Sequence, residues 1–120
     1  MTMRYALLAA CSLALLASTP EADAHAFLVR ADPAVGSVIA SSPKTVRIQF
    51  TESLMLPLSS IKVLNRVGTT LSTNARFDGA NHNVLVVDLM SLPPGAYSVQ
   101  WLAVSVDMHQ TEGTFTFTVK

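Results

Sequence analysis

The sequence predicts an all-β domain of about seven strands, built as a small Greek-key β-barrel or an immunoglobulin-like sandwich. Apolar and polar side chains alternate with a period of two in several short runs. Gly, Pro, Asn and Asp separate these runs, and no window keeps apolar residues at helical spacing. With 120 residues the chain has room for one such domain.

The first 24 residues are predicted to be a secretory signal peptide. The run 6–17 (ALLAACSLALLA) is apolar except for one serine, and Ala22-Asp23-Ala24 has the small-x-small pattern of a cleavage site. Twelve residues of helix span roughly 18 Å, less than the ~30 Å hydrocarbon core, so we expect cleavage and no stable membrane insertion afterwards. The mature domain, 25–120, is then expected to begin at His25 and to be exported.

A lipoprotein leader is the alternative. The run Leu8-Ala9-Ala10-Cys11 is similar to a lipoprotein cleavage box, and Cys11 is the single cysteine of the chain. Only ten residues precede Cys11, with almost no apolar stretch among them, so we favour cleavage after Ala24. The mature domain then has no cysteine and folds without disulfides.

The strands are expected in a regular order along the mature chain. Val46, Ile48 and Phe50 alternate with polar neighbours, and the same alternation recurs near the C-terminus. The expected strands are 26–30, 46–51, 60–64, 84–89, 97–106 and 114–119. The turns between them are expected at 32–37, 42–44, 65–68, 78–81 and 92–95.

Tyr97 and Trp101 are predicted to be structural. Tyr97 follows Pro93-Pro94-Gly95, which is typical of the corner where a Tyr hydroxyl bonds upstream backbone in immunoglobulin-like sandwiches. Trp101 has the same strand parity as Tyr97, so we expect it to pack in the core.

Composition and motifs exclude several classes of function. Eight basic and eight acidic residues leave no surplus charge for a phosphate backbone, so no nucleic-acid partner is expected. There is no nucleophile elbow, phosphate loop, HExxH or CxxC motif. We expect the Ser and Thr residues on solvent-facing strand positions or in turns. His82, between Asn81 and Asn83, has no partner in sequence and is expected to be exposed.

His25, Asp107 and His109 are the candidate metal ligands. After cleavage the amine and imidazole Nδ1 of His25 can chelate one ion, and Cu(II) has the strongest nitrogen preference among the divalent ions. In an extended chain Asp107 and His109 project to the same side, with Met108 pointing away. Alternatively, His25 is an arbitrary first residue of an exported protein. Asp107 and His109 could likewise be a surface pair that only increases solubility.

The ordered motifs of the mature chain resemble the periplasmic copper-binding CopC family. The resemblance runs from His25 to the C-terminus. It rests on His25-Ala26-Phe27-Leu28, Asp32-Pro33-Ala34-x-Gly36-Ser37, Pro43-x-x-Val46-x-Ile48-x-Phe50-Thr51-Glu52, Pro94-Gly95-x-Tyr97 and Val104-Ser105-Val106-Asp107-Met108-His109-x-x-x-Gly113-x-Phe115-x-Phe117.

This resemblance implies a Cu(II) site formed by the amine and imidazole of His25 together with Asp107 and His109. It implies that Glu52 lies at or beside the metal, although Glu52 could also be a solvated strand-end residue. It further implies an inner-membrane copper transporter of the CopD type as a partner. Members that also hold Cu(I) have a methionine-rich loop, whereas the mature chain has three separated Met residues, so no thioether site is expected.

The predicted function is a copper carrier or buffer in copper homeostasis and resistance, and not an enzyme. One alternative is a copper monooxygenase-like enzyme, which needs an extended substrate surface with exposed aromatic side chains. The other is an immunoglobulin-like interaction domain that binds no metal.

Overall fold

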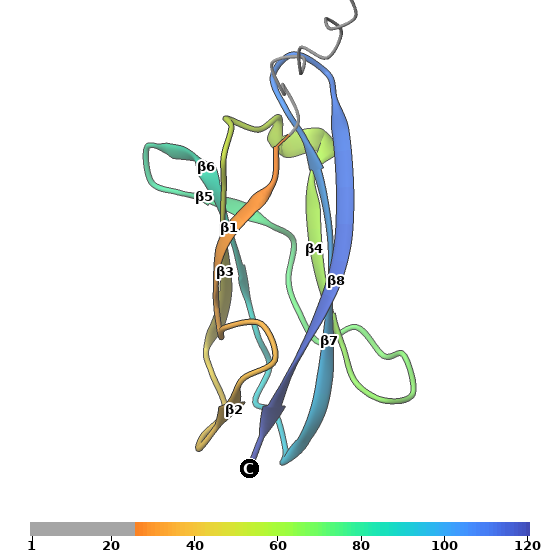
Figure 1. The fold of residues 1–120 in the computed structure, drawn as a ribbon. Coiled ribbons are helices and arrows are strands. Elements are labelled where there is room, and N and C mark those ends of the chain that lie inside the picture. Colours follow the sequence, from red (N-terminus) through yellow and green to blue (C-terminus); the bar gives the residue numbers. More distant parts are fainter. Residues whose placement is uncertain (1–25) are drawn as a thin grey trace, which may run out of the picture.

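The computed structural model describes residues 26–120, so the predicted leader and His25 lie outside the described residues. Within this range eight strands form two four-stranded sheets that pack face to face (Figure 1). The strands are β1 (Leu28–Asp32), β2 (Val38–Ile39), β3 (Thr45–Phe50), β4 (Ser60–Leu64), β5 (Arg76–Asp78), β6 (Asn81–Asp88), β7 (Gly95–Val104) and β8 (Gln110–Val119). A 3-10 turn, η2 (Leu56–Leu58), precedes β4. In this described part no helix is long and apolar enough to cross a membrane.

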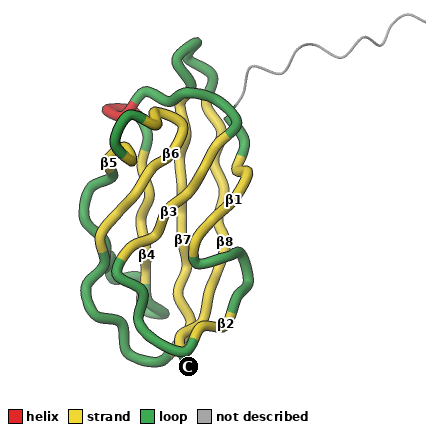
Figure 2. Tube along the Cα trace, turned by 90° about the vertical axis from the view of Figure 1, so that its left-hand side faces the viewer, coloured by secondary structure: helices red, strands yellow, loops and turns green. Residues whose placement is uncertain are grey.

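The two sheets differ in how their strands pair. The first has the order β1-β3-β6-β5 and is antiparallel throughout. The second has the order β2-β8-β7-β4, and its edge strand β2 pairs with β8 in parallel. Of the two predicted architectures, the fold is therefore the sandwich. The two sheets do not close into a barrel (Figure 2).

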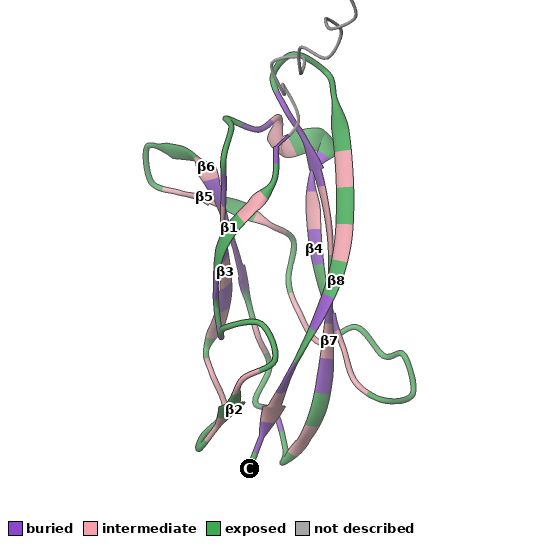
Figure 3. Ribbon diagram, in the orientation of Figure 1, coloured by how far each residue is buried: buried purple, intermediate pink, exposed green. Residues whose placement is uncertain are grey.

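The core lies between the two sheets and follows from the alternation in the sequence. On β3 the buried Val46, Ile48 and Phe50 alternate with half-exposed neighbours, as predicted. On β8 Phe115, Phe117 and Val119 are buried in the same way. Figure 3 shows buried positions on both sheets, and exposed positions in the connecting loops and along parts of β1 and β8.

All six expected strands are present, and two further strands were not predicted. β2 has two residues and β5 has three, so neither is long enough to show a period in the sequence. β2 forms because the loop 33–37 crosses to the second sheet, where the Gly36 N–H donates to the Thr116 carbonyl at 2.7 Å.

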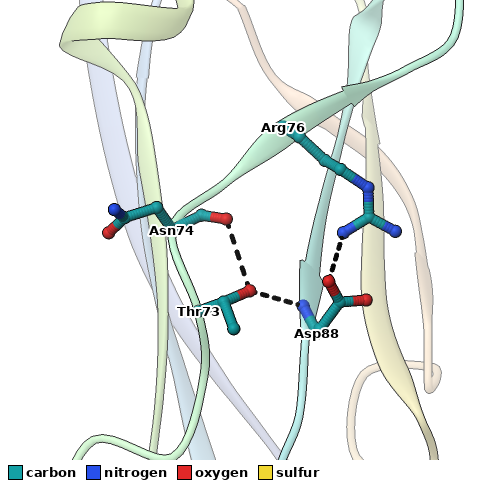
Figure 4. A network of polar contacts seen from close by, with 4 residues as sticks. All are labelled: Thr73, Asn74, Arg76 and Asp88. Carbon is teal, nitrogen blue, oxygen red and sulfur yellow. Dashed lines mark hydrogen bonds and ion pairs between the residues drawn. The ribbon is translucent and has the colours of Figure 1, made fainter.

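Polar contacts with neighbouring strands hold β5 on the first sheet. Arg76 forms an ion pair with Asp88 of β6 at 2.7 Å, and the Asp88 N–H donates to the Thr73 hydroxyl at 3.0 Å (Figure 4). Asp78 pairs with Arg47 of β3 at 2.5 Å. These side-chain contacts join β5 and the residues before it to β6 and β3.

The predicted corner at Tyr97 is confirmed. The Tyr97 hydroxyl donates a hydrogen bond to the Pro93 carbonyl, and the ring is buried against Phe117 with a centroid separation of 5.6 Å. Trp101 is partly buried and packs against the core, with its ring 5.2 Å from that of Phe50. Both residues are structural, as their strand parity predicted.

Candidate metal centre

The turn between β7 and β8 carries two of the predicted ligands. The Met108 N–H donates to the Ser105 carbonyl at 2.8 Å, and the Ser105 N–H donates to the His109 carbonyl at 2.9 Å. Met108 has φ 72°, a left-handed conformation that costs an L-residue roughly 1–2 kcal/mol. Asp107 and His109 are therefore brought together by a tight turn. The expectation that they share one side of an extended strand was wrong, because β7 ends at Val104.

Asp107 and His109 have a separation suited to one shared ion. The distance from Asp107 Oδ1 to His109 Nδ1 is 3.3 Å, and the two side chains are 48% and 50% exposed. Two ligands that bind one ion at about 2.0–2.1 Å, with an angle near 90–110° at the ion, lie roughly 2.9–3.4 Å apart. The pair can therefore hold a metal with little rearrangement, at a position open to solvent.

Ser105 lies beneath this pair and was not predicted as a site residue. Its side chain is buried, and its hydroxyl donates a hydrogen bond to Asp107 Oδ1. This hydrogen bond, followed by the interactions with His109, holds the pKa of Asp107 below its ordinary value. Ser105 lies in a turn, as expected for the Ser and Thr residues, but its burial and that of Ser59 were not expected, and each hydroxyl has polar partners inside the fold. The period-two pattern Ser-x-Asp-x-His was a signal that could have identified Ser105.

Glu52 is exposed and lies in the segment that runs beside the turn. The Val106 N–H donates to the carbonyl of Ser53 at 3.1 Å, and Leu54 forms an antiparallel bridge with Ser105. Among residues 26–120 no three His, Cys, Asp or Glu side chains are grouped closely enough to hold one ion. The structure thus brings Asp107 and His109 together, with the backbone next to Glu52 alongside them.

The first described residues are anchored beside the same turn. Ala26 is fully buried, and its carbonyl accepts a hydrogen bond from the Thr111 hydroxyl, two residues beyond His109. Phe27 exchanges hydrogen bonds with Thr51, each at 2.9 Å. The chain therefore enters the fold between the end of β3 and the start of β8.

His82 is exposed, as predicted, and makes a contact that the sequence did not indicate. Its ring stacks on Phe77 with a centroid separation of 4.3 Å and an interplanar angle of 13°. Its carbonyl accepts a hydrogen bond from the Leu54 N–H at 2.9 Å. His82 thus has a packing role at the β5–β6 hairpin.

Three relatives cover most of this chain, and two of them are named as copper proteins. Escherichia coli K12 YobA is 35% identical over an alignment of 121 positions that covers 99% of this chain and 95% of YobA. Copper resistance protein C of E. coli is 31% identical, covering 82% of this chain and 84% of that protein. Copper transport protein CutJ of Bacillus subtilis is 34% identical over an alignment of 98 positions that covers 80% of this chain and 18% of CutJ.

A solved structure and a family model agree with these relatives. The crystal structure of CopC from Methylosinus trichosporium OB3b superposes with a TM-score of 0.76 at 33% identity, covering 80% of this chain and 94% of that one. Residues 28–120 match the family model described as the CopC domain. The chain therefore belongs to the CopC family, whose members include copper resistance and copper transport proteins.

Proposed function

We propose that this protein is a periplasmic copper carrier or buffer that binds one Cu(II) through His25, Asp107 and His109. The observation that carries the proposal is the 3.3 Å separation of Asp107 and His109 in a turn next to the first described residues. The amine and the imidazole of His25 would both bind the ion, and Glu52 would lie at its edge. Copper is the cargo of such a protein, and no step of catalysis is required.

The attachment of Ala26 supports His25 as a ligand. The Ala26 carbonyl accepts a hydrogen bond from Thr111, and consecutive Cα atoms are about 3.8 Å apart, so a ligand one residue earlier would start close to this point. Thr111 is the second residue of β8, and His109 is the last residue before that strand. A mature chain that starts at His25 would thus have its amine near the Asp107–His109 pair.

The donor set favours Cu(II) over other divalent ions. Three nitrogen donors and one carboxylate form a set to which Cu(II), at the top of the divalent affinity series, binds most strongly. Half-exposed ligands allow the ion to enter and leave without opening the core. Both properties suit a protein that acquires copper and releases it.

Names and lengths of the relatives support a role in copper traffic. CutJ, a copper transport protein, contains a region similar to this chain as less than a fifth of its length. Since the similar region of CutJ is part of a larger transport protein, a chain that resembles this region is expected to work with a separate transport protein. An inner-membrane transporter of the CopD type would fill that role here, and the predicted leader would bring the mature domain to the periplasm.

The distribution of aromatic side chains gives little support to the copper monooxygenase alternative. Phe50, Tyr97, Phe115 and Phe117 are buried, as their strand parity predicted, and Phe27 is exposed near the site. An enzyme that binds an extended polysaccharide needs several exposed aromatic side chains on one surface. Consumption of oxygen in the presence of ascorbate would favour the enzyme.

A Cu(II) titration of the mature protein, starting at an authentic His25, tests the proposal. We expect one Cu(II) per chain and an electron paramagnetic resonance (EPR) spectrum with several nitrogen donors. His109→Ala should weaken binding by about a hundredfold or more, since losing a ligand costs a few kcal/mol and each 1.4 kcal/mol is about tenfold.

His82→Ala is the matched control, because His82 is an exposed histidine that stacks on Phe77 of the β5–β6 hairpin. It should leave the affinity for Cu(II) unchanged. Equal binding by wild type and His109→Ala would contradict the site, and no binding by wild type would favour the interaction domain without metal.

A further inference from the structure

We propose that Ser105 is the positioning residue of the copper site, and that its buried hydroxyl holds Asp107 and His109 ready for the ion. This inference rests on the proposed function, because it concerns the same site. Ser105 is only 1% exposed, whereas the two ligands that it would position are about half exposed. A fixed polar group therefore lies under a solvent-facing pair.

The hydrogen bonds of Ser105 reach all three residues of the Asp-x-His segment. Its hydroxyl donates to Asp107 Oδ1 and accepts from the His109 N–H at 3.3 Å. Its own N–H donates to the His109 carbonyl at 2.9 Å, and its carbonyl accepts from the Met108 N–H at 2.8 Å. These bonds hold the Asp107 carboxylate and the backbone of the turn at Met108 and His109.

Ser105 is itself fixed by the segment that follows β3. Leu54 pairs with Ser105, and the hydrogen bonds from Met55 N–H to Val104 and from Val106 N–H to Ser53 flank it on either side. A buried hydroxyl costs free energy unless it is hydrogen bonded. The Ser105 hydroxyl has two acceptors within reach, the Asp107 carboxylate and the His109 carbonyl at 3.3 Å, and the charged carboxylate is the stronger one. The carboxylate is thereby oriented before a metal ion arrives.

This preorganisation should increase the affinity for copper. A free Asp side chain and a free turn would lose conformational entropy when the ion binds, whereas the held pair has already lost it during folding. Groups that orient metal ligands without touching the metal typically change affinity by about 10- to 100-fold. Ser105 would act in this way through Asp107 Oδ1.

The test compares Ser105→Ala with Ser59→Ala in the mature protein. Ser59 is a matched control, because it is 8% exposed and its hydroxyl accepts a hydrogen bond from the Val104 N–H at 3.0 Å, one residue before Ser105. We expect Ser105→Ala to raise the dissociation constant for Cu(II) by about 10- to 100-fold and to change the EPR spectrum. Ser59→Ala should keep the affinity and spectrum of wild type even if it lowers the unfolding temperature.

A second pair of variants keeps the test decisive if Ser105→Ala folds poorly. Ser105→Thr and Ser105→Val add the same bulk and differ only in the hydroxyl, so Thr should bind Cu(II) more tightly than Val by about tenfold or more. Equal affinities for Thr and Val would overturn the proposal, as would equal losses in Ser105→Ala and Ser59→Ala. Failure of the wild-type protein to bind Cu(II) would instead contradict the proposed function.

Discussion

Asp107 and Glu52 are two carboxylates near one end of the sandwich, and their surroundings differ. Asp107 is hydrogen bonded by Ser105 and lies 3.3 Å from His109 Nδ1. Glu52 is exposed in a loop. The next residue, Ser53, contacts the turn through its backbone carbonyl. The first carboxylate is held next to another ligand, whereas the second precedes a residue whose backbone contacts the turn.

We therefore expect Glu52→Gln to reduce Cu(II) affinity less than Asp107→Asn. A peripheral group costs about 10- to 100-fold when it is removed, and a direct ligand costs more. Competition titrations of both variants against one chelator measure the difference. A loss in Glu52→Gln that equals the loss in His109→Ala would place Glu52 among the direct ligands.

Among the described strands β7 and β8 form the longest pair, and one glycine allows their side chains to pack. A Cβ atom at Gly113 would lie 2.6 Å from Cζ2 of Trp101, and the Trp101 ring is held at 64° against Phe50. The indole thus covers the Gly113 backbone, in a space that no larger residue can share.

Gly113→Ala should destabilise the fold by about 1–3 kcal/mol, because the added methyl group overpacks a stiff ring. Urea unfolding of the metal-free protein measures this change. Thr114 is the next residue of β8 and is exposed, so Thr114→Ala should cost at most about 0.5 kcal/mol. Equal stabilities for Gly113→Ala and wild type would contradict the packing described here.

The ion pair between β3 and β5 gives the fold an acid-sensitive contact. The hydrogen bond from Arg47, at 2.5 Å, lowers the pKa of Asp78. A lowered pKa in the folded state stabilises the protein above the unfolded-state value of about 3.9, and this contribution is lost as the pH falls through the folded value.

Asp78→Asn should therefore flatten the dependence of stability on pH below about pH 4, because the variant has no carboxylate to titrate there. The difference from wild type should be largest near neutral pH and should shrink in acid. Urea unfolding at a series of pH values measures both curves. Parallel curves with a constant offset would show that Asp78 does not contribute through its charge.

At the scale of the whole molecule, one end of the sandwich gathers segments that are far apart in the sequence. Ala26 and Thr111 are 85 residues apart and share a hydrogen bond, and Thr51 lies next to Phe27. A site at this end would therefore depend on where the mature chain starts.

A protein with one extra residue before His25 should bind Cu(II) about a hundredfold more weakly than the authentic mature form. The nitrogen of His25 would then be an amide without a basic lone pair, and each lost 1.4 kcal/mol is about tenfold in affinity. Competition titration of both forms at one pH tests this, with thermal unfolding as the control for the fold. Equal affinities would leave two imidazoles and one carboxylate, a set that also suits zinc.

The sequence alone determined the features that depend on neighbouring residues. Alternation predicted the long strands, because successive side chains of a strand point to opposite faces. The Pro-Pro-Gly-x-Tyr pattern predicted a bond from Tyr97 to upstream backbone, and the acceptor is Pro93, only four residues earlier. The Asp-x-His spacing predicted that Asp107 and His109 lie together, although the turn that joins them was not foreseen.

Tertiary structure decided the features that require contacts between distant segments. β2 and β5 are too short to have a period and exist because β8 and β6 offer them partners. The burial of Ser105 follows from its pairing with Leu54, about fifty residues earlier in the chain. Local sequence encodes the extended conformation of a strand and which of its side chains share a face. Which segments cover that face is decided only when the two sheets pack and exclude water from the surface between them.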